Sequence, residues 1–195
     1  MSGRKARSTA TAEDQETAIL NAAASEFAAV GARRANMDEV AAAAGVSRST
    51  LYRRFPNKEK LLLAVAVDAY EKGMLRLEAS VAGLGPREAV VEAFATGADM
   101  VGTDPLLSRM VLEDYEVRGV TASINTLFIE MVTDRVAATL REAGATMPDD
   151  LLHQAVELHV RLVISYLENP ATDPERATPD AARDLAQTFL APMIY

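Results

Sequence analysis

The chain contains no cysteine and no tryptophan, and only 5% of its 195 residues are aromatic. Without cysteine it has no disulfide framework, no thiolate metal site and no cysteine nucleophile. Its two histidines, His153 and His159, are six residues apart. On a helix this spacing places them about 240° apart, so they cannot share a metal ion. We therefore expect neither a metal site nor a bound cofactor.

Long apolar runs are also missing. The longest covers residues 61–67 and is too short to cross a bilayer. The first ten residues are polar and basic, and no apolar run follows them, so no signal peptide is predicted. We expect a cytoplasmic protein with no membrane partner.

Signatures of enzymes are weak as well. His153 and Glu157 are spaced i, i+4, which is better explained by a pair on a helix surface. No glycine-rich phosphate loop follows a strand pattern. We expect no catalytic residues, and an enzyme or a helical small-molecule carrier is kept only as an alternative.

What the sequence does contain is alanine-rich, helix-forming material, with 49% hydrophobic and 25% charged residues. Few aromatic residues and abundant alanine favour packed helices over sheets. No stretch shows strand alternation. The apolar spacing and the glycine and proline breaks predict an all-α fold of about nine helices, over residues 12–30, 37–44, 48–54, 58–79, 87–101, 105–117, 122–143, 150–168 and 179–191.

Residues 36–60 are predicted to form two short helices joined by a tight turn. Asn36 is a good N-cap, and Glu39 three residues later would complete a capping box. Gly45 follows the first helix, where the chain needs a left-handed conformation that glycine adopts cheaply. The spacing i, i+3, i+4, i+7 gives this helix one apolar face, made of Met37, Val40, Ala41 and Ala44.

The second short helix is capped by Ser47, and Leu51 and Phe55 can lock it to a core. Its other side chains are polar or basic: Arg48, Ser49, Thr50, Tyr52, Arg53 and Arg54. Two helices with a glycine turn are typical of a DNA-binding helix-turn-helix, and the basic surface fits an acidic partner. The alternative is a solvated helical corner, because helix hairpins with such turns are common.

The net charge of −8 is unevenly divided. Residues 1–60 carry 10 Lys and Arg against 7 Asp and Glu, whereas residues 61–195 carry 10 against 21. The basic part would attract phosphate, and the acidic part would favour one docking orientation on DNA. Acidic surfaces are also common for solubility. We predict a DNA-binding domain over residues 1–60 and a second helical domain over residues 61–195.

The helix-turn-helix residues also resemble a known family. Residues 37–41, 44–47 and 50–59 are similar to the N-terminal signature of the tetracycline-repressor (TetR) family, with a glycine turn, Leu-Tyr-x-x-Phe and Asn-Lys-Glu at fixed spacing. The resemblance implies a homodimeric repressor that binds a double-stranded DNA operator and is released by a small-molecule effector. A regulator without a ligand, or an activator, is the main alternative.

The residues expected to contact DNA lie in and around the helix-turn-helix: Arg33, Asn36, Ser47, Arg48, Ser49, Thr50, Tyr52, Arg53 and Lys58. Arg48 is expected to read a guanine, and Tyr52 and Lys58 are expected to bind phosphate. The basic residues within 1–10 could reach the DNA or form a frayed terminus. Asp38 departs from the family pattern, because an acid there should repel DNA. It could complement the helix N-terminus or face Arg33.

Members of this family hold small molecules in the C-terminal domain, so the resemblance implies a ligand pocket within residues 61–145. Polar residues such as Asp99 and Arg118 are interspersed there, but plain core packing is the alternative. The candidate ligand residues are Phe94, Met100, Met110, Tyr115, Ile124, Phe128 and Met131.

The last two long helices carry more apolar side chains than packing within one chain would bury. This surplus predicts a homodimer built on a two-fold four-helix bundle. The resemblance implies the same assembly. The expected dimer residues are Leu151, Leu152, Ala155, Leu158, Leu162, Val163, Tyr166, Leu185, Ala186 and Phe189.

Overall fold

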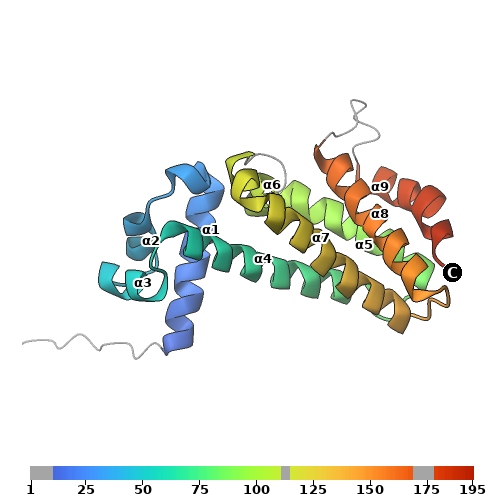
Figure 1. The fold of residues 1–195 in the computed structure, drawn as a ribbon, viewed down its shortest axis with the longest axis horizontal. Coiled ribbons are helices and arrows are strands. Elements are labelled where there is room, and N and C mark those ends of the chain that lie inside the picture. Colours follow the sequence, from blue (N-terminus) through green and yellow to red (C-terminus); the bar gives the residue numbers. More distant parts are fainter. Residues whose placement is uncertain (1–10, 111–114, 169–177) are drawn as a thin grey trace, which may run out of the picture. The chain divides into compact units, whose positions relative to one another are not determined.

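The structure is a computed structural model that describes residues 11–110, 115–168 and 178–195, with side chains left out at 115–128, 167, 168 and 179. Over these residues the chain forms nine α-helices and no strand (Figure 1). The predicted all-α fold is therefore confirmed.

The helices from α1 to α6 follow one another with short connections, as the glycine and proline positions predict. The described helices are α1 (Ala12–Arg34), α2 (Met37–Ala43), α3 (Arg48–Arg54), α4 (Lys58–Val81), α5 (Pro86–Thr103), α6 (Pro105–Ser108), α7 (Tyr115–Glu142), α8 (Asp149–Glu168) and α9 (Pro179–Leu185). A π-helical turn over Ala186–Leu190 and a 3-10 turn over Ala191–Met193 follow α9. None of the helices that the structure describes is long and apolar enough to cross a membrane.

The chain divides into two compact units, with the boundary between Asp68 and Ala69. The first unit contains α1, α2, α3 and the start of α4, and the second contains the rest. It stays a prediction that residues 1–60 bind DNA and that residues 61–195 bind the ligand and form the dimer.

The first unit is built around apolar side chains from four helices. Its buried residues include Ile19, Ala23 and Phe27 from α1, Val40 and Ala41 from α2, Leu51 from α3, and Leu61 and Val65 from α4. Gly31, predicted to end the first helix, instead marks a kink in α1, because its φ of 79° is not helical and the helix continues to Arg34. The short α2 and α3 are thus stabilised by packing rather than by their own length.

The second unit has one contiguous apolar core that joins α5, α7, α8 and the C-terminal turns. Leu152, Ala186 and Ile194 are each at most 1% exposed within it. An ion pair between Arg183 Nε and Glu92 Oε1, 3.1 Å apart, connects α9 to α5.

One predicted break is wrong. Gly119 was expected to separate two helices, but α7 runs without interruption from Tyr115 to Glu142. A glycine inside a helix costs only about 1 kcal/mol relative to alanine, and a helix of this length can tolerate that. The helix predicted over 105–117 is accordingly shorter: α6 ends at Ser108, and residues 111–114 lie outside the described part of the chain.

Candidate nucleic-acid interface and ligand cavity

The turn between α2 and α3 is fixed by its backbone. Gly45 has a φ of +67°, the left-handed conformation that the sequence predicts. Its N–H donates to the carbonyl of Ala42 at 3.1 Å, and the N–H of Val46 donates to the carbonyl of Ala41 at 3.0 Å. These bonds satisfy the last carbonyls of α2 and set the direction in which α3 leaves the turn.

Both short helices start at side-chain caps. Ser47 Oγ accepts from the N–H of Thr50 at 3.1 Å, and Asn36 Oδ1 accepts from the N–H of Asp38 at 2.8 Å. The capping box predicted for Asn36 and Glu39 is not formed. The N–H of Asn36 donates to Glu26 Oε1 of α1 at 3.1 Å, so a distant glutamate replaces the local one.

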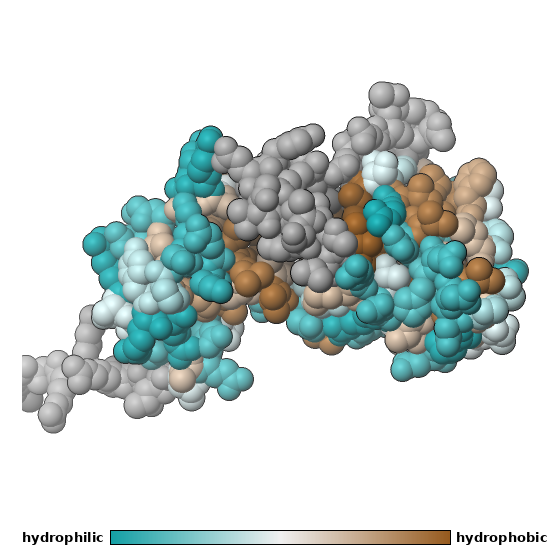
Figure 2. All heavy atoms as spheres, viewed as in Figure 1, coloured by the Kyte–Doolittle hydropathy of each residue, from teal (hydrophilic) through white to brown (hydrophobic). Residues whose placement is uncertain are grey.

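Helix α3 buries one side and exposes the other. Leu51 is fully buried and Phe55 is 8% exposed, as their spacing predicts. The opposite side chains are polar, with Thr50 half-buried and Arg48, Ser49, Tyr52 and Arg53 exposed. Figure 2 shows hydrophilic atoms over much of the visible surface of this unit. The helix therefore presents a polar, basic surface of the kind that meets DNA.

Arg54 does not belong to that surface, although the sequence groups it with the polar and basic side chains of this helix. Its NH1 donates to Glu16 Oε2 at 2.5 Å, and its NH2 donates to the carbonyl of Ala12 at 2.6 Å. The side chain is only 21% exposed. Arg54 thus joins the end of α3 to the start of α1, a long-range contact that the sequence does not reveal.

Asp38 and Arg48 form an ion pair between the first turns of α2 and α3. Asp38 Oδ2 lies 2.9 Å from Arg48 NH2, with side-chain exposures of 34% and 72%. The sequence offered Asp38 the helix N-terminus or Arg33 as its partner, and it did not anticipate this contact with Arg48.

Lys58 points back onto the first helix. Its Nζ donates to the carbonyl of Arg33 at 2.5 Å and to that of Ala35 at 3.2 Å. Arg33 and Asn36, two other residues expected to contact DNA, are exposed. The ammonium therefore stabilises the end of α1 in addition to any role toward phosphate, which stays a prediction.

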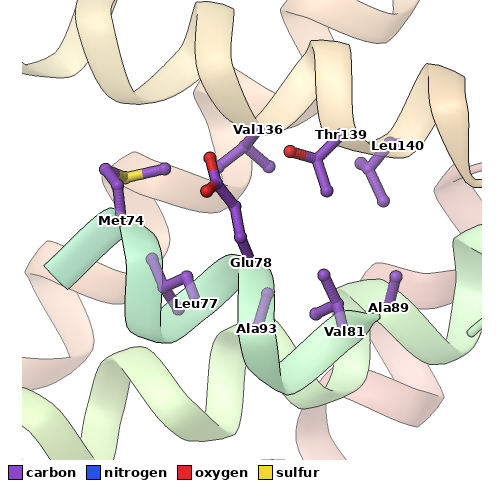
Figure 3. A pocket seen from close by; sticks show the side chains of 9 residues that line it. All are labelled: Met74, Leu77, Glu78, Val81, Ala89, Ala93, Val136, Thr139 and Leu140. Carbon is purple, nitrogen blue, oxygen red and sulfur yellow. The ribbon is translucent and has the colours of Figure 1, made fainter. Parts of the chain in front are cut away.

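An apolar cavity lies between α4, α5 and α7 in the second unit (Figure 3). The centre of a water-sized molecule can move through about 20 Å³ of this cavity. The cavity is therefore large enough for roughly one water molecule. A larger ligand would have to open it. The residues that line it are Met74, Leu77, Glu78, Val81, Ala89, Ala93, Val136, Thr139 and Leu140.

Glu78 is the charged side chain among these lining residues, and it extends from α4 toward α7 in Figure 3. Arg135 Nε donates to Glu78 Oε1 at 2.6 Å, and Arg135 NH1 donates to Glu71 Oε2 at 2.8 Å. The hydrogen bonds to these two carboxylates raise the pKa of Arg135 above its usual value, and the bond to Glu78 has the larger effect. The cation also lies 5.9 Å from the ring centroid of Tyr70. This network links α4 to α7 at the polar edge of the cavity.

The predicted ligand residues whose side chains the structure describes do not line this cavity, and their role stays a prediction. Phe94 and Met100 are buried, Met110 is half-buried and Met131 is 46% exposed, and none of the four lines the cavity. The side chains of Tyr115, Ile124 and Phe128 are outside the described part. The cavity residues escape sequence reasoning because their apolar spacing is the same as that of ordinary core.

The predicted dimer residues fall into two groups. Leu152, Ala155 and Ala186 belong to the core of the chain itself, and Val163, Tyr166 and Leu185 are half-buried. The exposed members are Leu151, Leu158, Leu162 and Phe189, at 42%, 50%, 48% and 68%. Figure 2 shows hydrophobic atoms gathered in the region of α8 and α9. Met193 and Tyr195, which are not in the predicted set, are also exposed, at 36% and 55%. Three of the four predicted side chains that are exposed lie on α8 and Phe189 lies in the turn that follows α9, and we call these four together the α8–α9 apolar face.

No group of three or more His, Asp or Glu that could hold a metal ion is found within the described ranges. A helix-turn-helix whose second helix is short, basic and exposed, followed by a larger helical unit, is the architecture of a DNA-binding regulator.

Family models identify that regulator class. Residues 19–65 match the model described as "Bacterial regulatory proteins, tetR family", and residues 86–189 match "Bacterial Tetracyclin repressor, C-terminal domain". The second match alone covers more than half of the chain. The chain belongs to the TetR family and is a transcriptional regulator, not an enzyme, as the helix-turn-helix signature predicted.

Relatives with known names are consistent with this family. The chain is 26% identical over 159 residues to the HTH-type transcriptional regulator UidR of Escherichia coli, which covers 80% of each chain. It is 29% identical over 134 residues to an uncharacterised HTH-type transcriptional regulator of Mycobacterium tuberculosis, which covers 67% of this chain and 69% of that one.

Solved structures share the fold. Salmonella enterica GusR gives a TM-score of 0.68 at 19% identity and covers 94% of this chain and 99% of its own. The TetR family repressor AlkX from Dietzia gives 0.66 at 22% identity, covering 92% and 96%. RolR in complex with resorcinol gives 0.62 at 18% identity, covering 93% and 88%.

Proposed function

We propose that this chain is a homodimeric repressor that binds a double-stranded DNA operator through α3 and is released from it by a small molecule. The observation that carries the proposal is the construction of α3. Leu51 and Phe55 anchor it, while Arg48, Tyr52 and Arg53 stay exposed on its other side. Operator DNA would be met in the cytoplasm, as the sequence predicts.

In this proposal the first turn of α3 reads bases in the major groove. Recognition helices meet base edges with their N-terminal residues, and Arg48 is the first residue of α3. Its guanidinium can donate to both acceptors of a guanine. Ser49, Thr50 and Arg53 would add contacts, and Tyr52 would bond phosphate.

The cavity between α4, α5 and α7 is the proposed effector site. Apolar side chains dominate its lining, which suits an apolar or amphipathic ligand, and Glu78 offers one polar anchor. RolR, which shares the fold, is described in complex with resorcinol. A regulator that senses no ligand, or that activates, is the competing proposal.

Coupling between effector and operator would use α4. This helix supplies Met74, Leu77 and Glu78 to the cavity, and its first residue, Lys58, bonds to the end of α1. A ligand that opens the cavity would shift α4 and so alter the spacing of the two heads in a dimer. Half-sites lie about 34 Å or a multiple of it apart, so a misfit of a few ångströms matters. The ligand acts only through different affinities for the two states.

Two measurements on the full chain test the proposal. A gel shift with a duplex selected from a random pool should show sequence-selective, salt-dependent binding. A panel of apolar and amphipathic compounds should then contain some that raise the melting temperature and weaken operator binding together. Ala93→Val, which narrows the cavity without adding a group as large as a ligand, should reduce both effects of those compounds while leaving operator affinity unchanged. Compounds that stabilise the chain without weakening operator binding would contradict the coupling.

A further inference from the structure

The ion pair between Asp38 and Arg48 places an acid against the first residue of α3. Asp38 Oδ2 lies 2.9 Å from Arg48 NH2, and both side chains reach the surface. The pair joins two different helices, so it is not a local contact within one turn. An exposed pair of this kind adds little to folding stability. Its location at the start of α3 therefore points to a role other than stability.

Both partners of the pair stand on rigid supports. The N–H of Asp38 is bonded to Asn36 Oδ1, and Ser47 caps the helix that starts with Arg48. The turn between them is closed by the backbone bonds of Gly45 and Val46. The backbones that carry the two side chains are therefore fixed relative to one another, so the Asp38 carboxylate is presented to the Arg48 guanidinium at the start of α3.

An acid at a DNA-facing surface weakens binding to every sequence, because it repels phosphate. Arg48 free of a partner would bind phosphates anywhere on the duplex. A guanidinium has five N–H donors, and Asp38 pairs with it at NH2, so donors on its other nitrogens are left for the O6 and N7 of a guanine. The carboxylate thus lowers general affinity while it leaves base reading intact.

We propose that Asp38 is a positioning residue for sequence recognition, which holds the Arg48 guanidinium for a guanine edge and disfavours its use on phosphate. The proposal rests on the proposed function of α3 as the reading helix. It predicts that Asp38 raises selectivity, the ratio of dissociation constants for non-cognate and cognate DNA, at the expense of general affinity.

Asp38→Asn tests this against a matched control. The substitution keeps the size and removes the charge, and Glu39→Gln removes the same charge one residue later in the same helical turn. The probes are a duplex selected from a random pool by the wild-type chain and a scrambled duplex of equal length and composition. Circular dichroism and melting temperature check that each variant keeps its fold.

Asp38→Asn should lower the selectivity ratio about fivefold or more, mainly by tightening binding to the scrambled duplex. Glu39→Gln should tighten binding to both duplexes by the same factor and leave the ratio unchanged. Arg48→Lys, which keeps the charge and loses the fork, should also lower the ratio. Equal ratios for Asp38→Asn and Glu39→Gln would overturn the proposal.

A double variant separates positioning from direct reading. In an Arg48→Ala background, Asp38→Asn should leave the ratio unchanged, because no guanidinium is left to hold. A further fall in the ratio there would mean that Asp38 contacts a base itself, and would overturn the positioning role.

If the wild-type chain selects no sequence, the proposed function fails and this inference falls with it. If the wild-type chain selects a sequence and Asp38→Asn leaves the ratio unchanged, only the inference fails.

Discussion

Lys58 Nζ lies 2.5 Å from the carbonyl oxygen of Arg33, so the first residue of α4 holds the last turn of α1. The sequence assigned this lysine to phosphate alone. The contact gives it a second role in the fold, since a charged donor on a carbonyl oxygen at a helix end stabilises that end.

Replacement of Lys58 should therefore affect both folding and binding. Lys58→Ala should lower the free energy of unfolding by about 1–2 kcal/mol, because two carbonyls lose a charged donor. It should also weaken binding to all DNA sequences about equally and reduce the salt slope by about one. Urea unfolding and salt titrations measure the two effects. The control is Lys60→Ala, which removes an exposed charge two residues later and should leave stability unchanged. A Lys58→Ala chain as stable as the wild type would contradict the structural role.

Arg48 and Arg54, at the two ends of α3, should respond in opposite ways. Arg48→Ala should cost about 1–3 kcal/mol at the cognate site and relax the preference at one base position, with stability retained. Arg54→Ala should destabilise the chain by about 1 kcal/mol, because the bonds to Glu16 and Ala12 are lost, but should not relax the sequence preference. Binding selections and thermal melts on both variants decide this. Equal effects of both on base preference would contradict the assignment.

The α8–α9 apolar face should hold the proposed dimer together. Leu162→Glu places a charge in that face and should convert the dimer to a monomer in sedimentation at micromolar concentration. Leu75→Glu is the matched control, because Leu75 is 60% exposed on α4 and should leave the mass unchanged. A wild-type chain that sediments as a monomer would contradict the dimer, and so would an unchanged mass for Leu162→Glu.

His159 should make stability depend on pH. The residue is 8% exposed, and its Nε2 has no hydrogen-bond partner in the described part of the chain. Burial lowers its pKa from 6.5 to about 4, with a hydrogen bond to the backbone of Leu190 acting in the opposite direction. Between these values the unfolded chain binds a proton that the folded chain does not, so stability falls as the pH falls through that window.

The loss at about pH 5 should reach about 2 kcal/mol relative to about pH 7. His159→Gln should lose less over the same change, while His153→Gln, at an exposed position on the same helix, should lose as much as the wild type. Urea unfolding at the two pH values measures this. The same loss in His159→Gln as in the wild type would show that another group carries the dependence.

Local signals predicted the helix-turn-helix well, because caps and turns depend on a few neighbouring residues. Gly45, Ser47, Leu51 and Phe55 all take the conformation or burial that their positions indicate. Contacts between distant residues were not predictable in the same way. The partners of Arg54 and Lys58 lie 38 and 25 residues away in the sequence, and no local pattern encodes them.

The cavity shows the same limit in the second unit. Met74, Ala93 and Val136 come from three helices, and only their packing shows that they enclose a space. Gly119 shows a different limit of prediction from sequence. Glycine ends helices at some positions and is tolerated inside them at others, as in α7. The family resemblance supplied the expected site types, but not the side chains that form the cavity.

If α3 reads operator DNA, the chain binds one DNA sequence in preference to others. We would select bound fragments from the source genome and then measure affinity for a selected duplex and a scrambled duplex over a range of salt concentrations. The selected duplex should bind at least about a thousandfold more tightly, with affinity for both falling steeply as salt rises. Equal affinities for the two duplexes, or affinity that does not change with salt, would contradict this role of α3.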